Sequence, residues 1–342
     1  MRVTRESLIR IAKETALERS FNDRSVIAAY LTGSLAMDGD PMLGGVTDID
    51  LVLVHNTPAP MSREIVKLTP DFHVDIHHRA KSDYRSTREL RSDPLLGYEM
   101  YDPMFLWQRE KFFEFVQAGL RAGSEFHSPA VVLARSRKLF DESRRGWIDL
   151  SDISAEKAGP LHVRQFLQAV ENVANAVAEL NGAPLSERRF LVEFPTRAEV
   201  ADHPDLTEGL FNLIGGPQVD AAALTSWLPA WAADFNTAAQ ETRVDLSIHP
   251  ARLNYYEKGI QALLEGETPL TALWPLIHNW TLASQAISPQ PSSPWETASR
   301  QLGLLGETFE QRVSELDKYL DQVEIRLDEI AAASGVETSR KP

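Results

Sequence analysis

The stretch LTGSLAMDGDPMLGGVTDIDLVLVH, residues 31–55, decides the fold of this chain. It starts within an apolar run that predicts a buried strand over 25–33. A turn at Gly33-Ser34 and a loop rich in Gly and Asp follow. The β-prone run over 48–56 then predicts a second strand.

Two carboxylates in this second strand point in the same direction. Asp48 and Asp50 are two residues apart, so in a strand they share a face, while Ile49 and Leu51 turn to the opposite layer. Like charges on one strand face repel each other and are costly beside a core, and a divalent cation relieves that cost. Mg²⁺ prefers oxygen ligands from one or two carboxylates together with phosphates and water. The pattern therefore predicts a site for a metal ion and a nucleotide.

A third acid and the glycine turn extend this prediction. Asp75 lies in a further predicted strand over 73–78, where it would reach the same metal or take a proton from an attacking hydroxyl. Gly33 has no Cβ, which lets the backbone approach a triphosphate closely. Ser34 adds a hydroxyl and an N–H group that face phosphate oxygens.

The order of these features resembles the signature of the nucleotidyltransferase superfamily related to DNA polymerase β. That signature is an apolar residue, Gly-Ser, a spacer, an Asp-x-Asp pair within an apolar strand, and a third acid on a later strand. The likeness covers about residues 31–78. It implies a triphosphate held by Gly33 and Ser34, and Mg²⁺ held by Asp48, Asp50 and Asp75.

The resemblance also implies an activity. It is the Mg²⁺-dependent transfer of a nucleoside monophosphate from an NTP, with ATP the expected donor, to a hydroxyl acceptor, with release of pyrophosphate. We expect the acceptor to be a small molecule. The alternatives are an antitoxin-like enzyme acting on protein or RNA, and a non-catalytic nucleotide-binding protein that binds a partner. Asp75 is the expected base, and Glu171 on a predicted helix over 159–182 is the alternative.

Composition narrows the choice of partners. Among 342 residues, 35 are Lys or Arg and 49 are Asp or Glu, which gives a net charge of −14. Such a chain is a poor general binder of nucleic acid, whose affinity comes largely from basic groups on phosphates. There is no cysteine, which excludes disulfides and thiolate metal sites. The charged N-terminus lacks the apolar core of a signal peptide, and no apolar run is long enough to span a membrane, so we expect a soluble cytoplasmic protein.

The length and periodicity predict an α+β protein with two domains. Residues 1–150 mix helices with short strands and would form a small mixed-sheet nucleotidyltransferase domain. Residues 151–342 show helical periodicity nearly throughout and would form a helical bundle. A small catalytic domain followed by helices also resembles the aminoglycoside nucleotidyltransferases, in which the helical domain helps to shape the acceptor cleft.

Other patterns have simpler interpretations. His73, Asp75 and His77 alternate and would share a strand face, which is one arrangement for a transition-metal site, but we favour the role of Asp75 given above. Arg188 is expected on a solvated or salt-bridged helix face. Trp274, Trp280 and Trp295 are expected between helices. The apolar stripe over 309–330 is expected to pack within the chain, with a homodimer coiled coil as the alternative.

Overall fold

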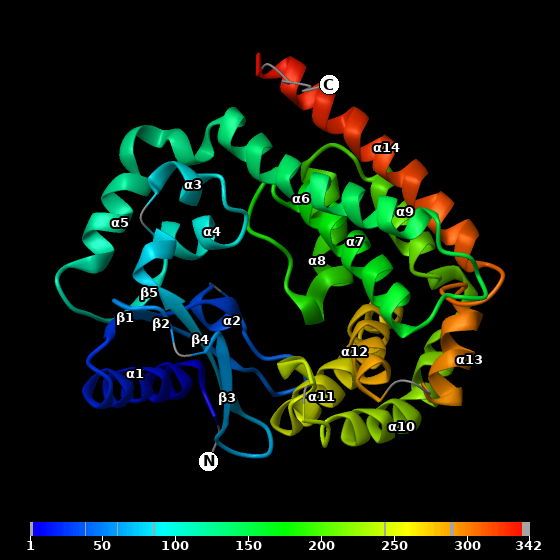
Figure 1. Ribbon diagram of the computed structural model, residues 1–342, viewed down its shortest axis with the longest axis horizontal. Coiled ribbons are helices and arrows are strands. Elements are labelled where there is room, and N and C mark those ends of the chain that lie inside the picture. The colour runs from blue at the N-terminus through cyan, green and yellow to red at the C-terminus, as the bar shows by residue number, and fades with distance from the viewer. Residues whose placement is uncertain are drawn as a thin grey trace. The chain divides into compact units, whose positions relative to one another are not determined.

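The computed structural model describes residues 3–37, 39–59, 61–84, 86–242, 244–287 and 291–336 (Figure 1). The chain divides into two compact units, Met1–Phe126 and His127–Pro342. Every described strand lies in the first unit, and the second is helical. The expected α+β fold, with a mixed sheet followed by a helical domain, is confirmed.

The first unit is built on one mixed five-stranded sheet. Its strands are β1 (Val26–Leu31), β2 (Ile49–His55), β3 (Arg63–Lys67), β4 (His73–Ala80) and β5 (Met104–Gln108). They lie in the order β3-β4-β2-β1-β5. The neighbours β2 and β4 are parallel, and the other neighbouring pairs are antiparallel. Strands β1, β2 and β4 agree with the strands expected over 25–33, 48–56 and 73–78. The sequence analysis missed β3, a short edge strand that is only half-buried.

Helices cover both faces of this sheet (Figure 1). They are α1 (Arg5–Asn22), α2 (Gly33–Ala36), η1 (Lys81–Tyr84), α3 (Thr87–Arg91), α4 (Leu96–Tyr101), α5 (Phe112–Leu120) and η2 (Ala122–His127). Helix α1 begins after Thr4, because Thr4 and Ser7 form a reciprocal capping box at its N-terminus.

Side-chain alternation along β2 separates two cores. Leu51 and Leu53 pack on the side of α1, together with Leu8. Val52 and Val54 point to the other side, toward residues of η1, α3, α4 and α5. The predicted two-faced character of this strand is confirmed, and Asp50 lies on the same face as Val52 and Val54.

The second unit contains only helices among its described residues. They are α6 (Pro129–Ser151), α7 (Pro160–Ala178), η3 (Glu187–Arg189), α8 (Phe190–Val200), α9 (Asp205–Leu213), η4 (Gly216–Gln218), α10 (Ala221–Ala238), η5 (Leu246–Ile248), η6 (Pro250–Arg252), α11 (Leu253–Leu264), η7 (Pro269–Ala272), α12 (Leu273–Ala286), α13 (Ser293–Gln301) and α14 (Phe309–Ala333). Across the described part of the chain, every helix is too short or too polar to cross a lipid bilayer.

The compact units divide near Phe126, whereas the sequence placed the boundary near residue 150. Helix α6 causes the difference, because it packs along α7. Ser143 Oγ on α6 donates to the carbonyl of Ala169 on α7 at 2.6 Å. Arg135 Nε lies 3.0 Å from Glu179 Oε2, and both side chains are fully buried. These polar contacts between helices cannot be read from the periodicity of α6.

The aromatic and apolar residues of the second unit form its core. Trp274, Trp280 and Trp295 are fully buried, as the sequence predicted. The stripe of α14 is buried within the unit, at residues such as Leu316 and Leu327, which is the intrachain packing that we favoured. Arg188 does not lie on a solvated face, the first of the two positions expected for it. Its side chain is buried, and its guanidinium lies 3.5 Å from the centroid of a tyrosine ring, that of Tyr255.

A partly buried ion pair connects η3 to α12. Glu187 Oε1 lies 3.0 Å from His278 Nδ1, and the Tyr256 hydroxyl donates to Glu187 Oε2 at 2.9 Å. Burial alone would raise the pKa of the Glu187 carboxyl, but the hydrogen bond and charge of His278 lower it to about 2. Burial alone would lower the pKa of His278, but Glu187 raises it above the ordinary value.

The stability that this ion pair contributes should decrease at both low and high pH. Stabilisation from His278 is complete below the unfolded pKa of 6.5 and is lost as the pH rises through the higher folded pKa. Stabilisation from Glu187 is complete above the unfolded value of 4.5 and is lost as the pH falls toward about 2. We therefore expect His278→Gln to cost most in free energy of unfolding, roughly 1–3 kcal/mol, at about pH 5.5.

Urea unfolding of wild type and His278→Gln at about pH 5.5 and pH 9 checks this expectation, because the cost should shrink at the higher pH. His127→Gln, which removes an exposed imidazole, is the control. A cost for His278→Gln that does not change with pH would contradict the assignment.

Candidate metal centre

Two carboxylates lie side by side on parallel strands. Asp50 on β2 and Asp75 on β4 are direct partners in the register of the two strands. Their neighbours Leu51 and Ile76 belong to the core on the side of α1, so both carboxylates point to the other face. Parallel strands are about 4.8 Å apart, which brings the two acidic side chains together.

A histidine completes the group. His77 lies two residues after Asp75 on the same face of β4. One ligand atom from each of Asp50, Asp75 and His77 lies within 4.8 Å of the other two. Among the described residues, this is the group of acidic and imidazole side chains that suits a metal ion. The donors are two carboxylate oxygens and one imidazole nitrogen, which fits a divalent cation.

Asp48 lies outside this group. It comes just before β2, which begins at Ile49, and its side chain is buried with 4% exposure. Among the described residues, the ligand atoms that lie within 4.8 Å of one another come from Asp50, Asp75 and His77. The metal-ligand role of Asp48 therefore stays a prediction.

The turn after β1 presses against Asp50. The Thr32 N–H donates to the Asp50 carbonyl at 3.0 Å, and Gly33 follows with a φ of +66°. A Cβ on Gly33 would lie 1.9 Å from Asp50 Oδ2. Only glycine fits here, which supports the interpretation of this turn as a close backbone approach. The Ser34 hydroxyl lies 3.0 Å from the Thr47 hydroxyl, and this contact ties the turn to the loop before β2.

Arg63 balances the charge of Asp75. This arginine is on the edge strand β3, and its Nε donates to Asp75 Oδ1 at 2.7 Å, while an Nη2 group contacts Oδ2. The Asp75 side chain is only 1% exposed, so an unpaired charge there would be costly. Sequence reasoning missed Arg63 because it missed β3. The pair of β-branched residues in REIVK, residues 63–67, was the available signal.

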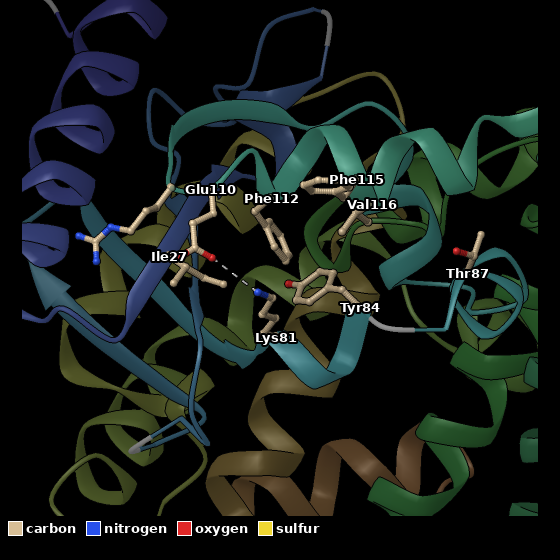
Figure 2. Close-up of a pocket in the computed structure, with 9 residues that line it drawn as sticks. Ile27, Lys81, Tyr84, Thr87, Glu110, Phe112, Phe115 and Val116 are labelled. Atoms are coloured by element: carbon tan, nitrogen blue, oxygen red, sulfur yellow. Dashed lines mark ion pairs between the residues drawn. The ribbon is translucent and has the colours of Figure 1, made fainter.

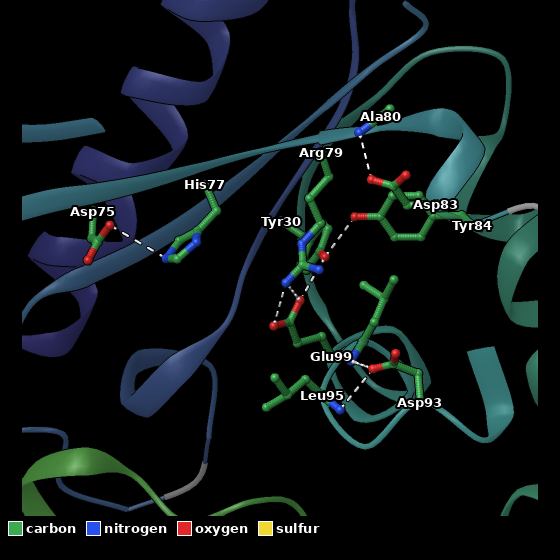
Figure 3. A network of polar contacts seen from close by, with 11 residues as sticks. Tyr30, Asp75, His77, Arg79, Ala80, Asp83, Tyr84, Asp93, Leu95 and Glu99 are labelled. Atoms are coloured by element: carbon green, nitrogen blue, oxygen red, sulfur yellow. Dashed lines mark hydrogen bonds and ion pairs between the residues drawn. The ribbon is translucent and has the colours of Figure 1, made fainter. Parts of the chain in front are cut away.

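A partly buried polar network lies further along β4 on the same face (Figure 3). Arg79 Nη2 donates to both carboxylate oxygens of Glu99 at 2.9 Å. The Tyr30 hydroxyl donates to Glu99 Oε2 at 3.0 Å and lies 3.0 Å from the Tyr84 hydroxyl. Burial raises the pKa of the Glu99 carboxyl. These contacts fix α4 and η1 to the sheet that carries the acids.

A separate cavity of about 310 Å³ lies toward the beginning of β1 (Figure 2). Aromatic side chains, including Tyr84 and Phe112, line it, and Lys81 Nζ lies 3.9 Å from Glu110 Oε2 at its wall. Ile27 lines this cavity, whereas Asp50 lies beside Thr32, at the other end of the strand. None of the predicted site residues lines the cavity.

Glu171, the alternative base, belongs to the second unit. It lies on α7, where Gln168 Nε2 donates to its Oε2 at 3.1 Å. Burial raises the pKa of its carboxyl, while His278 works in the opposite direction. Its assignment as a base stays a prediction.

Comparisons with known proteins give a coarse result. No family model matches the chain, and no curated protein matches it. A solved structure of a nucleotidyltransferase-like protein from Exiguobacterium sibiricum is similar to it, with 11% sequence identity and a TM-score of 0.32. The match covers 98% of this chain and 96% of the other. A likeness of that degree assigns no role to any residue of this chain.

The close contact between Gly33 and Asp50 predicts that a larger side chain at position 33 destabilises the fold. Gly33→Ala adds a methyl group where Asp50 already lies and strains a positive φ, so it should lower the free energy of unfolding. Gly45→Ala is the matched control, because Gly45 has a φ of +74° and nothing within 4 Å of its Cβ position.

Urea unfolding of the two variants should show Gly33→Ala less stable than Gly45→Ala by about 1–3 kcal/mol. Equal losses would mean that backbone strain alone accounts for both, and that the turn does not press on Asp50.

Proposed function

We propose that this chain is a divalent-cation-dependent nucleotidyltransferase. The observation that supports the proposal is the pairing of Asp50 with Asp75, beside a turn that only glycine can form. Two carboxylates with a close backbone approach fit the cation and phosphates of a metal–nucleotide complex. A divalent ion at Asp50 and Asp75 would supply positive charge to the phosphates of the donor NTP, and carboxylate oxygens are the ligands that Mg²⁺ prefers.

The proposed reaction transfers a nucleoside monophosphate to a hydroxyl group. The acceptor oxygen forms a bond to the α-phosphorus, and the bond from that phosphorus to the leaving pyrophosphate breaks. The hydroxyl proton passes to a carboxylate, which we assign to Asp75, with Glu171 as the alternative. Gly33, Ser34 and Asp48 would position the triphosphate and complete the metal shell.

We assign a small hydroxyl-bearing molecule as the acceptor and ATP as the donor. The net charge of −14 disfavours RNA and favours a cationic acceptor, since an acidic surface attracts positive charge. Protein-directed transfer and nucleotide binding without turnover are the alternative outcomes of the tests below.

Nucleotide binding is the first test. The unfolding temperature of the wild type should rise with at least one of ATP, GTP, CTP and UTP, and only with Mg²⁺ or Mn²⁺ present. A ligand at 100 times its Kd stabilises the folded state by about 2.7 kcal/mol. The double variant Asp50→Asn, Asp75→Asn should lose this shift.

The control removes two carboxylates elsewhere. Glu14 and Glu18 are exposed on α1, so Glu14→Gln with Glu18→Gln matches the change in charge and should keep the shift. A shift that survives in the Asp50, Asp75 variant would place the nucleotide elsewhere. Release of pyrophosphate with a panel of polyhydroxylated amines then tests transfer, and binding without turnover on any acceptor would favour the non-catalytic alternative.

A further inference from the structure

The position of His77 bears on which ion the centre takes. Its Nε2 lies 3.5 Å from Asp75 Oδ1, a long contact for a hydrogen bond. The charge of Asp75 is already balanced by Arg63, which reaches both carboxylate oxygens. A second cation beside the same carboxylate is therefore not needed to offset its burial.

The geometry suits a shared ion. Two ligand atoms on one ion at about 2.0–2.2 Å lie about 3–3.5 Å apart. The distance between His77 Nε2 and Asp75 Oδ1 already has this value, and the third ligand atom, from Asp50, lies within 4.8 Å of both. A carboxylate oxygen has two lone pairs, so Asp75 Oδ1 can accept from Arg63 and still face an ion.

The donor set discriminates between ions. Carboxylate oxygens and water suit both Mg²⁺ and Mn²⁺, whereas an added imidazole nitrogen favours a first-row transition metal over Mg²⁺. His77 is 34% exposed, so the outer side of the group is open to water or a phosphate. His73, the other histidine of the alternating pattern, is fully buried and is not part of the group of described ligands.

We propose that Asp50, Asp75 and His77 form a centre that binds a first-row transition-metal dication, such as Mn²⁺ or Co²⁺, in preference to Mg²⁺. This inference deepens the proposed function, since it names the ion of the same site. Its test uses metal binding in the absence of nucleotide, so that it can fail or succeed independently of nucleotide transfer.

The experiment compares the full-length, metal-free wild type with His77→Gln and His77→Asp. Affinities for Mn²⁺, Co²⁺ and Mg²⁺ come from calorimetric titration. We expect His77→Gln to weaken binding of Mn²⁺ and Co²⁺ by at least about tenfold and to change Mg²⁺ binding much less. We expect His77→Asp to move the preference toward Mg²⁺, because its donors are all oxygen.

Spectroscopy reports the ligand directly. Mn²⁺ bound to the wild type should show electron spin-echo modulation from a coordinated imidazole nitrogen, and this signal should be absent from His77→Gln. His127→Gln, which removes an exposed imidazole in the other unit, should keep both the signal and the affinity. Thermal unfolding of each variant confirms that it is folded.

Three results would overturn the proposal: no nitrogen signal in the wild type, equal loss of Mg²⁺ and Mn²⁺ affinity in His77→Gln, or a wild type that prefers Mg²⁺. The last result, together with Mg²⁺-dependent nucleotide binding, would leave the proposed function intact. Tight Mn²⁺ binding through His77 with no nucleotide binding would support the centre and count against the transferase.

Discussion

The pairing of Asp50 with Asp75 across β2 and β4 is the constraint on which the first unit depends. Two unit charges about 4 Å apart repel by roughly 4 kcal/mol at an effective dielectric constant of 20. Asp75 is nearly fully buried, so water screens it poorly. The fold places positive or metal-binding groups around this pair, with Arg63 from the edge strand and His77 from β4 itself.

The rest of the sheet keeps this pair in place. The parallel register of β2 and β4 sets the two acids opposite each other, and the alternation of side chains sends apolar neighbours such as Leu51 and Ile76 into the core under α1. The turn at Gly33 closes against Asp50 from β1. A shift of one residue in the register of β2 and β4 would turn the acids into that core. The burial of apolar residues and the pairing of the two acids therefore favour the same register.

Sequence patterns predicted the parts of the fold that are local. Strand β2 alternates between two faces as expected, because this periodicity depends on near neighbours in the sequence. Edge strand β3 was missed because its residues are half-buried and give a weak pattern. Arg63 was missed with it, and a partner on the neighbouring strand leaves no mark on the sequence around Asp75. Arg188 was expected on a solvated or salt-bridged face. It is buried, its guanidinium lies against the Tyr255 ring, and it donates to the Tyr255 carbonyl.

The alternating His-x-Asp-x-His pattern does not by itself show which histidine lies beside both acids. The sequence offers His73 and His77 as equivalent partners for Asp75, since both lie two residues away on the same strand face. Only the neighbouring strands distinguish them. In β4, His73 is fully buried, whereas His77 is partly exposed and joins the acids of two strands. Strand β2 places Asp50 opposite Asp75. The three possible metal ligands therefore come from two neighbouring strands, Asp50 from β2 and Asp75 and His77 from β4.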